Sequence, residues 1–253
     1  MGKKWDTVLD KPEAIQSTSR TVHVYERLRG SILAGELKPS AKIKINEICA
    51  AWQVSLGAVR EALSRLNAEG LVVLTPQKGA QVAPISREDL LDLTRVRIEL
   101  ETVALRESIQ RGGLVWETRV VAAYHRLSRL RQNAPNESGE MTYDWADAHS
   151  EFHLALVSAC DSPWLLRLRK LLYDQSERYR RLSAPASVST RDVAAEHAAL
   201  MEAAMARDAD LATELLARHL NTTAQVLLDS TGFVEALGSG ARGKAKRVDV
   251  QPA

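Results

Sequence analysis

The stretch at residues 52–73, WQVSLGAVREALSRLNAEGLVV, constrains the fold more than any other part of the sequence. Apolar residues recur at the i, i+3, i+4, i+7 spacing of a helix that is buried along one side, at Val59, Ala62, Leu63 and Leu66. The opposite side carries small and charged residues, namely Gly57, Ala58, Arg60, Glu61, Ser64 and Arg65. Ser55 stands where an N-cap belongs, and Gly70 stands just past the expected C-terminus. The sequence therefore predicts a helix between these two residues, with a small and basic outer face.

A shorter amphipathic segment precedes this helix. Ile45, Ile48 and Trp52 lie on one face of it, and residues 53–55 form a tight link to the longer helix. Two short helices joined by about three residues are typical of a helix-turn-helix motif, whose second helix enters the major groove of DNA. The stretch 44–69 is therefore predicted to be a helix-turn-helix that contacts double-stranded DNA.

The flanking segments complete a winged fold. A helix is expected at 21–34, before the helix-turn-helix. After it, two β-like runs at 71–74 and 80–83 enclose the sequence TPQKG, which predicts a hairpin with a basic tip. Because glycine lets the backbone approach a ligand closely, Lys78 and Gly79 at this tip are placed to approach a phosphate or the minor groove.

From residue 86 onward the sequence shows helical patterns and no strand pattern. Six stretches are separated by short glycine-, proline- or polar-rich links, and they lie at 87–110, 115–132, 143–160, 163–182, 190–206 and 208–230. Helices joined by short links pack as antiparallel neighbours. The predicted fold is mainly α: an N-terminal winged helix-turn-helix at 19–85, followed by an all-α antiparallel six-helix bundle at 86–232. Residues 1–18 are expected to be a flexible N-terminus, and residues 233–253 a flexible basic tail.

Charge is divided unevenly between the two predicted domains. Residues 1–85 hold 12 basic and 8 acidic side chains, whereas residues 86–232 hold 18 and 22. A basic N-terminal part suits a nucleic-acid-binding module. The sequence lacks an apolar run long enough to span a membrane, and its first residues lack the apolar segment of a signal peptide. With Cys49 and Cys160 interpreted as buried free thiols, these features predict a cytoplasmic protein without a membrane partner.

Among the six histidines, His149 and His153 lie four residues apart in a predicted helix. Side chains at i and i+4 project from one face, which is a common arrangement for two metal ligands. His197 and His219 lie on two later helices, so a bundle can bring all four together, although a lone helical histidine is more often an ordinary core or surface residue. The H-E-x-x-H pattern of zinc hydrolases is not matched, because Glu151 lies about 200° around the helix from His149. The sequence therefore does not predict an enzyme.

These residues match a known family. The run VS-x-x-x-VREAL-x-RL-x-x-EGL, a glycine-tipped wing and a helical second half resemble the GntR family of bacterial transcription regulators. The second half also resembles the FCD effector domain of the FadR subfamily, through a set of residues comprising Arg97-x-x-x-Glu101, Phe152-His153, His197 and His219. The resemblance covers most of the chain, from about residue 20 to about residue 230.

The resemblance implies which residues are functional. In this family the C-terminal domain commonly holds a divalent metal and binds a small carboxylate beside it. The positions that match the metal ligands are His149, His153, His197 and His219, and zinc or nickel is the expected ion. Arg97 matches the arginine that pairs with the effector carboxylate; its alternative interpretation is an ordinary surface arginine. The residues expected to contact DNA are Lys44, Asn46, Ser55, Gly57, Arg60, Arg65, Lys78 and Gly79.

Three departures from the family pattern have consequences. His149 stands where relatives usually have aspartate, which implies a less anionic site made of four histidines. Leu56 and Gly57 replace an Arg-Thr or Arg-Ser pair that many relatives carry, so one expected contact with DNA is missing. Ser40 replaces a common glycine in the turn before the helix-turn-helix.

The sequence thus predicts a homodimeric, ligand-responsive transcription regulator. It is expected to be a repressor that binds a pseudo-palindromic operator and is released when a small carboxylate binds beside the metal. Two alternatives remain: a constitutive DNA-binding protein whose histidines are structural, and a metal-dependent enzyme with an accessory DNA-binding domain.

Overall fold

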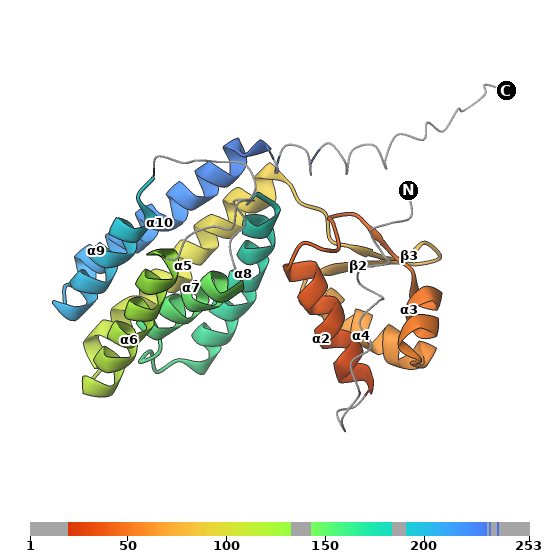
Figure 1. Cartoon of the computed structure of the whole chain (residues 1–253), viewed down its shortest axis with the longest axis horizontal. Helices are drawn as coiled ribbons and strands as arrows, with labels where there is room; N and C mark the ends of the chain where they lie inside the picture. Colours follow the sequence, from red (N-terminus) through yellow and green to blue (C-terminus); the bar gives the residue numbers. More distant parts are fainter. Residues whose placement is uncertain (1–19, 133–142, 184–190, 232, 234–236, 238–253) are drawn as a thin grey trace. The chain divides into compact units, whose positions relative to one another are not determined.

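The computed structural model describes residues 20–132, 143–183, 191–231, 233 and 237 (Figure 1). The expected flexible N-terminus and nearly all of the expected basic tail lie outside the described residues. The chain divides into two compact units: the first contains residues up to 86 together with residues 177–182 and those from 233 onward, and the second contains residues 87–176 and 183–232.

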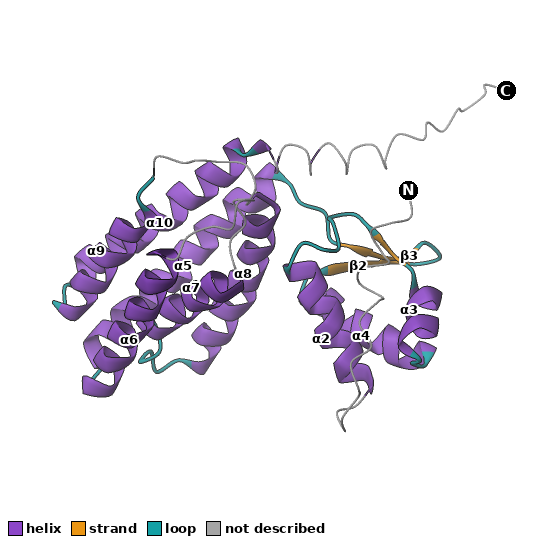
Figure 2. Cartoon of the chain, in the orientation of Figure 1, coloured by secondary structure: helices purple, strands orange, loops and turns teal. Residues whose placement is uncertain are grey.

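The first unit combines helices with a small antiparallel sheet (Figure 2). Its main elements, in chain order, are α2 (Arg20–Leu33), β1 (Lys42–Ile43), α3 (Ile45–Trp52), α4 (Leu56–Ala68), β2 (Val72–Thr75) and β3 (Gly79–Val82). The strand order is β1-β3-β2, and Gln81 of β3 lies opposite Lys42 on one side and Val73 on the other. The sequence does not predict β1, because two residues are too few to show an alternating pattern. The predicted winged helix-turn-helix is confirmed, with α3 and α4 as its two helices.

Helix α4 begins and ends at the signals that the sequence contains. Ser55 Oγ accepts a hydrogen bond from the backbone N–H of Ala58 at 3.2 Å, which satisfies one of the unpaired donors of the first turn. Gly70 has a φ of 72°, and the backbone N–H of Leu71 donates to the carbonyl of Leu66 at 2.9 Å. The link from α3 turns through Gln53 at a φ of 51°. These local bonds fix the direction of α4.

The inner side of α4 packs into the core of the first unit. Val59, Leu63 and Leu66 are almost completely buried, together with Leu28 of α2. Ala58 contradicts the predicted outer face, because only 8% of its surface is exposed. It lies one turn before Ala62, so the buried stripe is wider than the i, i+3, i+4, i+7 set suggested.

The second unit is a bundle of six helices, although residues 177–182, near the end of the fourth of these helices, belong to the first unit. The six helices are α5 (Arg87–Arg111), α6 (Leu114–Gln132), α7 (Tyr143–Leu156), α8 (Pro163–Ser183), α9 (Val193–Met205) and α10 (Ala209–Asp229). Helix α10 lies against α5 and α9, while α6 lies against α7 and α9 (Figure 1). The prediction of an all-α bundle is confirmed. Within the described residues, none of the helices is both long and apolar enough to cross a membrane.

The sequence placed the end of α7 at residue 160, but the helix ends at Leu156. Tight turns replace it, with the N–H of Ser158 bonded to the carbonyl of Ala155 and the N–H of Cys160 bonded to that of Val157, both at 3.1 Å. Val157 and Cys160 stay buried after the helix has ended, so the apolar pattern continues although the helix does not. Both cysteines are free thiols, and Cys49 is only half-buried.

Candidate metal centre and nucleic-acid interface

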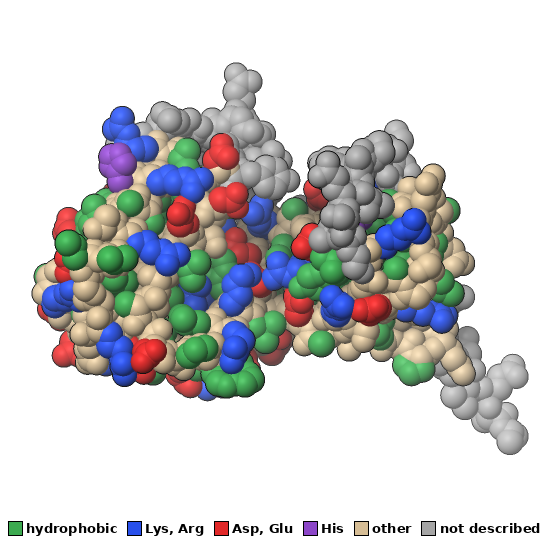
Figure 3. Space-filling view, turned by 90° about the horizontal axis from the view of Figure 1, so that it is seen from below, with side chains coloured by type: hydrophobic (Ala, Val, Ile, Leu, Met, Phe, Trp, Pro, Cys, Tyr) green, Lys and Arg blue, Asp and Glu red, His purple; other side chains and the backbone are tan. Residues whose placement is uncertain are grey.

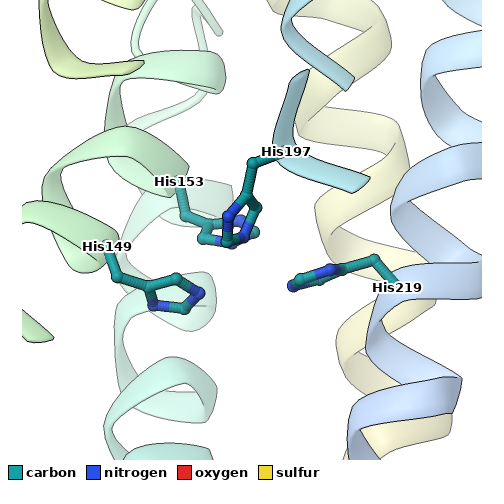
Figure 4. A group of neighbouring side chains, drawn as sticks. All are labelled: His149, His153, His197 and His219. Carbon is teal, nitrogen blue, oxygen red and sulfur yellow. The ribbon is translucent and has the colours of Figure 1, made fainter. Parts of the chain in front are cut away.

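Four histidine side chains meet inside the second unit. His149 and His153 come from α7, His197 from α9 and His219 from α10, and their rings point toward one another (Figure 4). One nitrogen from each ring lies within 4.8 Å of those of the other three. Their exposed fractions are 7%, 2%, 3% and 6%, so the group is enclosed by the bundle. Four nitrogen atoms gathered this closely could hold one metal ion.

The helices position these rings through short-range features. The four-residue spacing of His149 and His153 places both on the inner face of α7, and their ring centroids are 4.5 Å apart. Helices α9 and α10 follow each other across a short turn, and each begins at an aspartate cap. Asp192 accepts from the N–H of Ala195 and Asp208 from the N–H of Leu211, both at 3.0 Å.

A carboxylate behind His219 fixes the orientation of its ring. His219 Nδ1 lies 2.7 Å from Glu196 Oε2, and because an ionised carboxylate only accepts, Nδ1 carries the hydrogen. Arg191 holds the carboxylate in turn, with its Nε 2.6 Å from Glu196 Oε1. Burial alone would raise the pKa of Glu196, but the hydrogen bonds from His219 and Arg191 lower it to about 2. The remaining nitrogen of His219, Nε2, is thereby left as a lone-pair donor, as in carboxylate–histidine–metal arrangements.

His153 provides the test of whether a metal fits. Both of its ring nitrogens are buried, and neither has a hydrogen-bond partner among the described residues. Burial, then the neighbouring His219 and His197, lower its pKa well below the usual range, so the ring is neutral. An unsatisfied buried polar group costs about 1–3 kcal/mol. A metal ion needs a neutral imidazole with a free lone pair, and His153 offers one, so the residues present fit a divalent ion.

Next to the histidine group lies a buried cluster of charged side chains. Arg97 Nε donates to Glu101 Oε1 at 2.6 Å, and Arg169 Nε lies 3.4 Å from Glu101 Oε2. Both guanidinium groups also lie over the ring of Tyr173, at 5.2 and 5.0 Å from its centroid. Burial alone would raise the pKa of Glu101, but the charges of Arg97 and Arg169 lower it, so the carboxylate stays ionised. We refer to Arg97, Glu101 and Arg169 as the arginine cluster.

Sequence reasoning identified Arg97 but missed Arg169 and Glu196. Arg97 is not a surface arginine, because it is buried with its charge paired. Arg169 stands on α8, a helix rich in charged residues, where only its four-residue spacing from Tyr173 offered a signal. Glu196 directly precedes His197 in the sequence, and nothing local indicates that it serves His219 instead.

All eight residues expected to contact DNA are exposed on the first unit. Three of them, Lys44, Asn46 and Arg60, line one surface hollow of about 450 Å³ between α3 and α4. The wing tip lines another of about 500 Å³, which includes Lys78 and Gly79.

The eight residues differ in how free they are to bind. Among the described residues Arg60 makes no ion pair, whereas Arg65 Nη2 lies 2.5 Å from Glu61 and Lys44 Nζ lies 2.7 Å from Glu47. Gly57 leaves the tip of α4 open, since an added Cβ would meet only Ser55 Oγ at 3.9 Å. On the face of the second unit in Figure 3, basic side chains are interspersed with acidic and apolar ones, so its charge is mixed.

Comparisons with known proteins agree with this division. The family described as bacterial regulatory proteins, gntR family, matches residues 20–82, and the family described as FCD domain matches residues 92–222. The HTH-type transcriptional regulator BphR of Paraburkholderia xenovorans is 43% identical over 80% of this chain and 83% of its own length. The HTH-type transcriptional repressor GlaR of Escherichia coli is 35% identical over 80% of this chain and 93% of its own.

A solved structure gives the same result for the fold. A GntR transcriptional regulator from Rhodococcus sp. RHA1 superposes with a TM-score of 0.68 at 26% identity, over 84% of this chain and 99% of that one. These relatives and structural neighbours are transcription regulators, which supports the prediction that the chain is not an enzyme.

Proposed function

The chain belongs to the gntR family of bacterial regulatory proteins and carries an FCD domain, and from this premise we propose that it is a metal-dependent, carboxylate-responsive repressor. A DNA-binding regulator of this family needs a site where a small molecule changes its affinity for DNA. The convergence of four buried histidines in the second unit is the observation that carries the proposal. It gives the helical unit a chemistry that a purely structural domain does not require.

The first unit binds the operator. Two copies of the chain, each presenting one α4, bind the two halves of a pseudo-palindromic site. Arg60 contacts a phosphate or a base, while Ser55 and Gly57 allow the tip of α4 to come close to the groove. Lys44, Asn46, Arg65, Lys78 and Gly79 complete the contact surface, and their positive charges make binding strongly dependent on salt.

The second unit binds the effector. His149, His153, His197 and His219 hold a divalent ion, for which imidazole ligands suit zinc or nickel. When bound, this ion supplies a positive charge that attracts and polarises an anionic ligand. Arg97 offers a planar fork that matches a carboxylate, and it lies in the arginine cluster whose positive charges reach His153. A carboxylate bound there favours the arrangement of the two DNA-binding units that does not fit the operator.

The test compares His153→Ala with His125→Ala. His153 is central to the histidine group, whereas His125 is an exposed histidine on α6 and serves as the matched control. Elemental analysis should find metal in the wild type and in His125→Ala but strongly reduced metal in His153→Ala, because each ligand is a large share of the binding energy.

Operator binding is measured on the same three proteins, with and without a panel of short carboxylic acids. The His153→Ala variant should still bind operator DNA selected from a random library, but it should no longer be released by an acid that releases the wild type. Full metal occupancy in His153→Ala would contradict the proposed centre. A wild type that binds no metal and ignores every acid would support the constitutive DNA-binding alternative.

A further inference from the structure

Arg169 is almost completely buried, but some of its hydrogen-bond donors have no partner among the described residues. Only 2% of its surface is exposed, yet its Nη2 is buried without a hydrogen-bond partner among the described residues. Its Nε lies 3.4 Å from Glu101 Oε2, but outside hydrogen-bond geometry. A guanidinium can donate five hydrogen bonds, and leaving donors unmet in an interior is costly. These donors therefore point to an acceptor that the described residues do not provide.

The charges of the arginine cluster lead to the same conclusion. Among the ion pairs of the described residues, Arg97 and Arg169 share the single carboxylate of Glu101. One negative charge thus faces two positive charges, and all three side chains are buried. An unpaired charge in a protein interior is unfavourable unless something compensates it. The cluster is one negative charge short.

The histidine group cannot supply this charge. Its imidazoles are neutral when they bind a metal, so a divalent ion keeps its full charge. Glu196, the carboxylate behind His219, is already matched by Arg191. One carboxylate on the ligand would offset part of the charge at the metal and leave Arg169 unmatched.

We propose that Arg169 binds a second carboxylate of the effector, so that the ligand of this site is a short dicarboxylate. This inference rests on the proposed function, because it assigns the other carboxylate to the metal and Arg97. Arg169 is then a specificity-determining residue: it distinguishes ligands with two anionic groups from ligands with one.

The variant Arg169→Met tests this assignment. Methionine keeps much of the length and apolar contact of the side chain, while Glu101 keeps its 2.6 Å partner Arg97 as a neutral pair. The variant should therefore fold, and its melting temperature should equal or exceed that of the wild type. Arg167→Met is the matched control, since Arg167 stands on the same helix but is exposed and stacks on Trp164.

The measurement is calorimetric titration of the full-length, zinc-loaded proteins. The probes are the unbranched dicarboxylates from malonate to adipate and the monocarboxylates of the same lengths, from propionate to hexanoate. The best dicarboxylate should bind the wild type and Arg167→Met about tenfold to a hundredfold more tightly than its monocarboxylate, which is the contribution of one charge-assisted pairing. In Arg169→Met this preference should fall to about threefold or less, through weaker binding of the dicarboxylate alone.

Different failures have different meanings. Equal binding of both series to the wild type, with binding present, would overturn the second carboxylate and leave the proposed function intact. An equal loss of both series in Arg169→Met would overturn it too, because Arg169 would then share a single carboxylate with Arg97. If no probe binds the zinc-loaded wild type, the proposed carboxylate site itself is wrong, and the inference falls with it.

Discussion

Glu196 should control metal affinity without touching the metal. Its carboxylate accepts the Nδ1 hydrogen of His219 at 2.7 Å, which orients the ring and increases the basicity of Nε2. Glu196→Gln keeps an acceptor of nearly the same shape and loses only the charge, whereas Glu196→Leu loses both. Arg191 still donates to the carbonyl of His219 at 3.0 Å and to Thr223 Oγ1 at 2.9 Å, so the surroundings should persist in both variants.

The two variants should give a graded loss. Removing such a partner typically costs about tenfold to a hundredfold in metal affinity, or about 1.4–2.7 kcal/mol. Glu196→Gln should lose about tenfold in metal affinity, because the hydrogen bond to His219 survives, whereas Glu196→Leu should lose about a hundredfold. Competition with a chromogenic zinc chelator measures the dissociation constant, and the absorption spectrum of the cobalt-loaded protein reports the coordination geometry.

A control separates this effect from a general loss of charge. Glu214→Gln removes an exposed carboxylate of α10 that pairs with Arg218 at 2.5 Å, and it should leave the zinc affinity unchanged. The reasoning would be refuted if Glu196→Leu bound zinc as tightly as the wild type. It would also be refuted if Glu214→Gln lost as much affinity as the Glu196 variants.

Four further predictions follow from particular contacts. Arg60→Ala should weaken operator binding by about 1–3 kcal/mol in a fluorescence titration, and Arg65→Ala should weaken it less, because Arg65 is already paired within α4. Arg97→Ala should bind the operator normally without ligand but resist release by an acid that releases the wild type; normal release would remove Arg97 from the site. Ser40 has a φ of 63°, so Ser40→Gly should raise the free energy of unfolding by about 1 kcal/mol or less, as measured by urea denaturation. Folding lowers the pKa of Glu101, so this carboxylate stabilises the metal-free protein above pH about 4.5, and the stabilisation is lost as the pH falls through its lowered folded-state pKa. Glu101→Gln should therefore make the free energy of unfolding depend less on pH in acid, as measured by urea denaturation at a series of pH values.

Local sequence patterns predicted most helices and strands of this fold, because each of these elements has its own apolar spacing, cap or turn residue. The four-residue spacing of His149 and His153, the cap at Ser55 and the proline that opens α8 are local features, and each one is found where the sequence indicated. Strand β1 and the early end of α7 were not predictable, because tertiary packing rather than a local pattern decides them.

The residues that sequence reasoning missed share one property: their role depends on a partner far away in the chain. Arg169 reaches Glu101 from another helix, and Glu196 serves His219 rather than its neighbour His197. The sequence around a single charged residue on a helix does not show whether its side chain pairs with a buried group or faces solvent. Only the side-chain contacts between α5 and α8, and between α9 and α10, reveal these roles.

In the proposed site, the charge of the metal centre connects this sequence to its ligand. Four neutral imidazoles leave the charge of a divalent ion intact, whereas the aspartate that the family pattern places at position 149 would cancel one unit of it. In the proposed site, His149 therefore leaves the negative charge to the ligand, and among the described residues the arginine cluster adds one more unmatched positive charge. Uncompensated charge in an interior costs several kcal/mol per ion. In the proposed function, only the part of this stabilisation that differs between the two arrangements of the DNA-binding units releases the operator, and such coupling is typically about 1–3 kcal/mol.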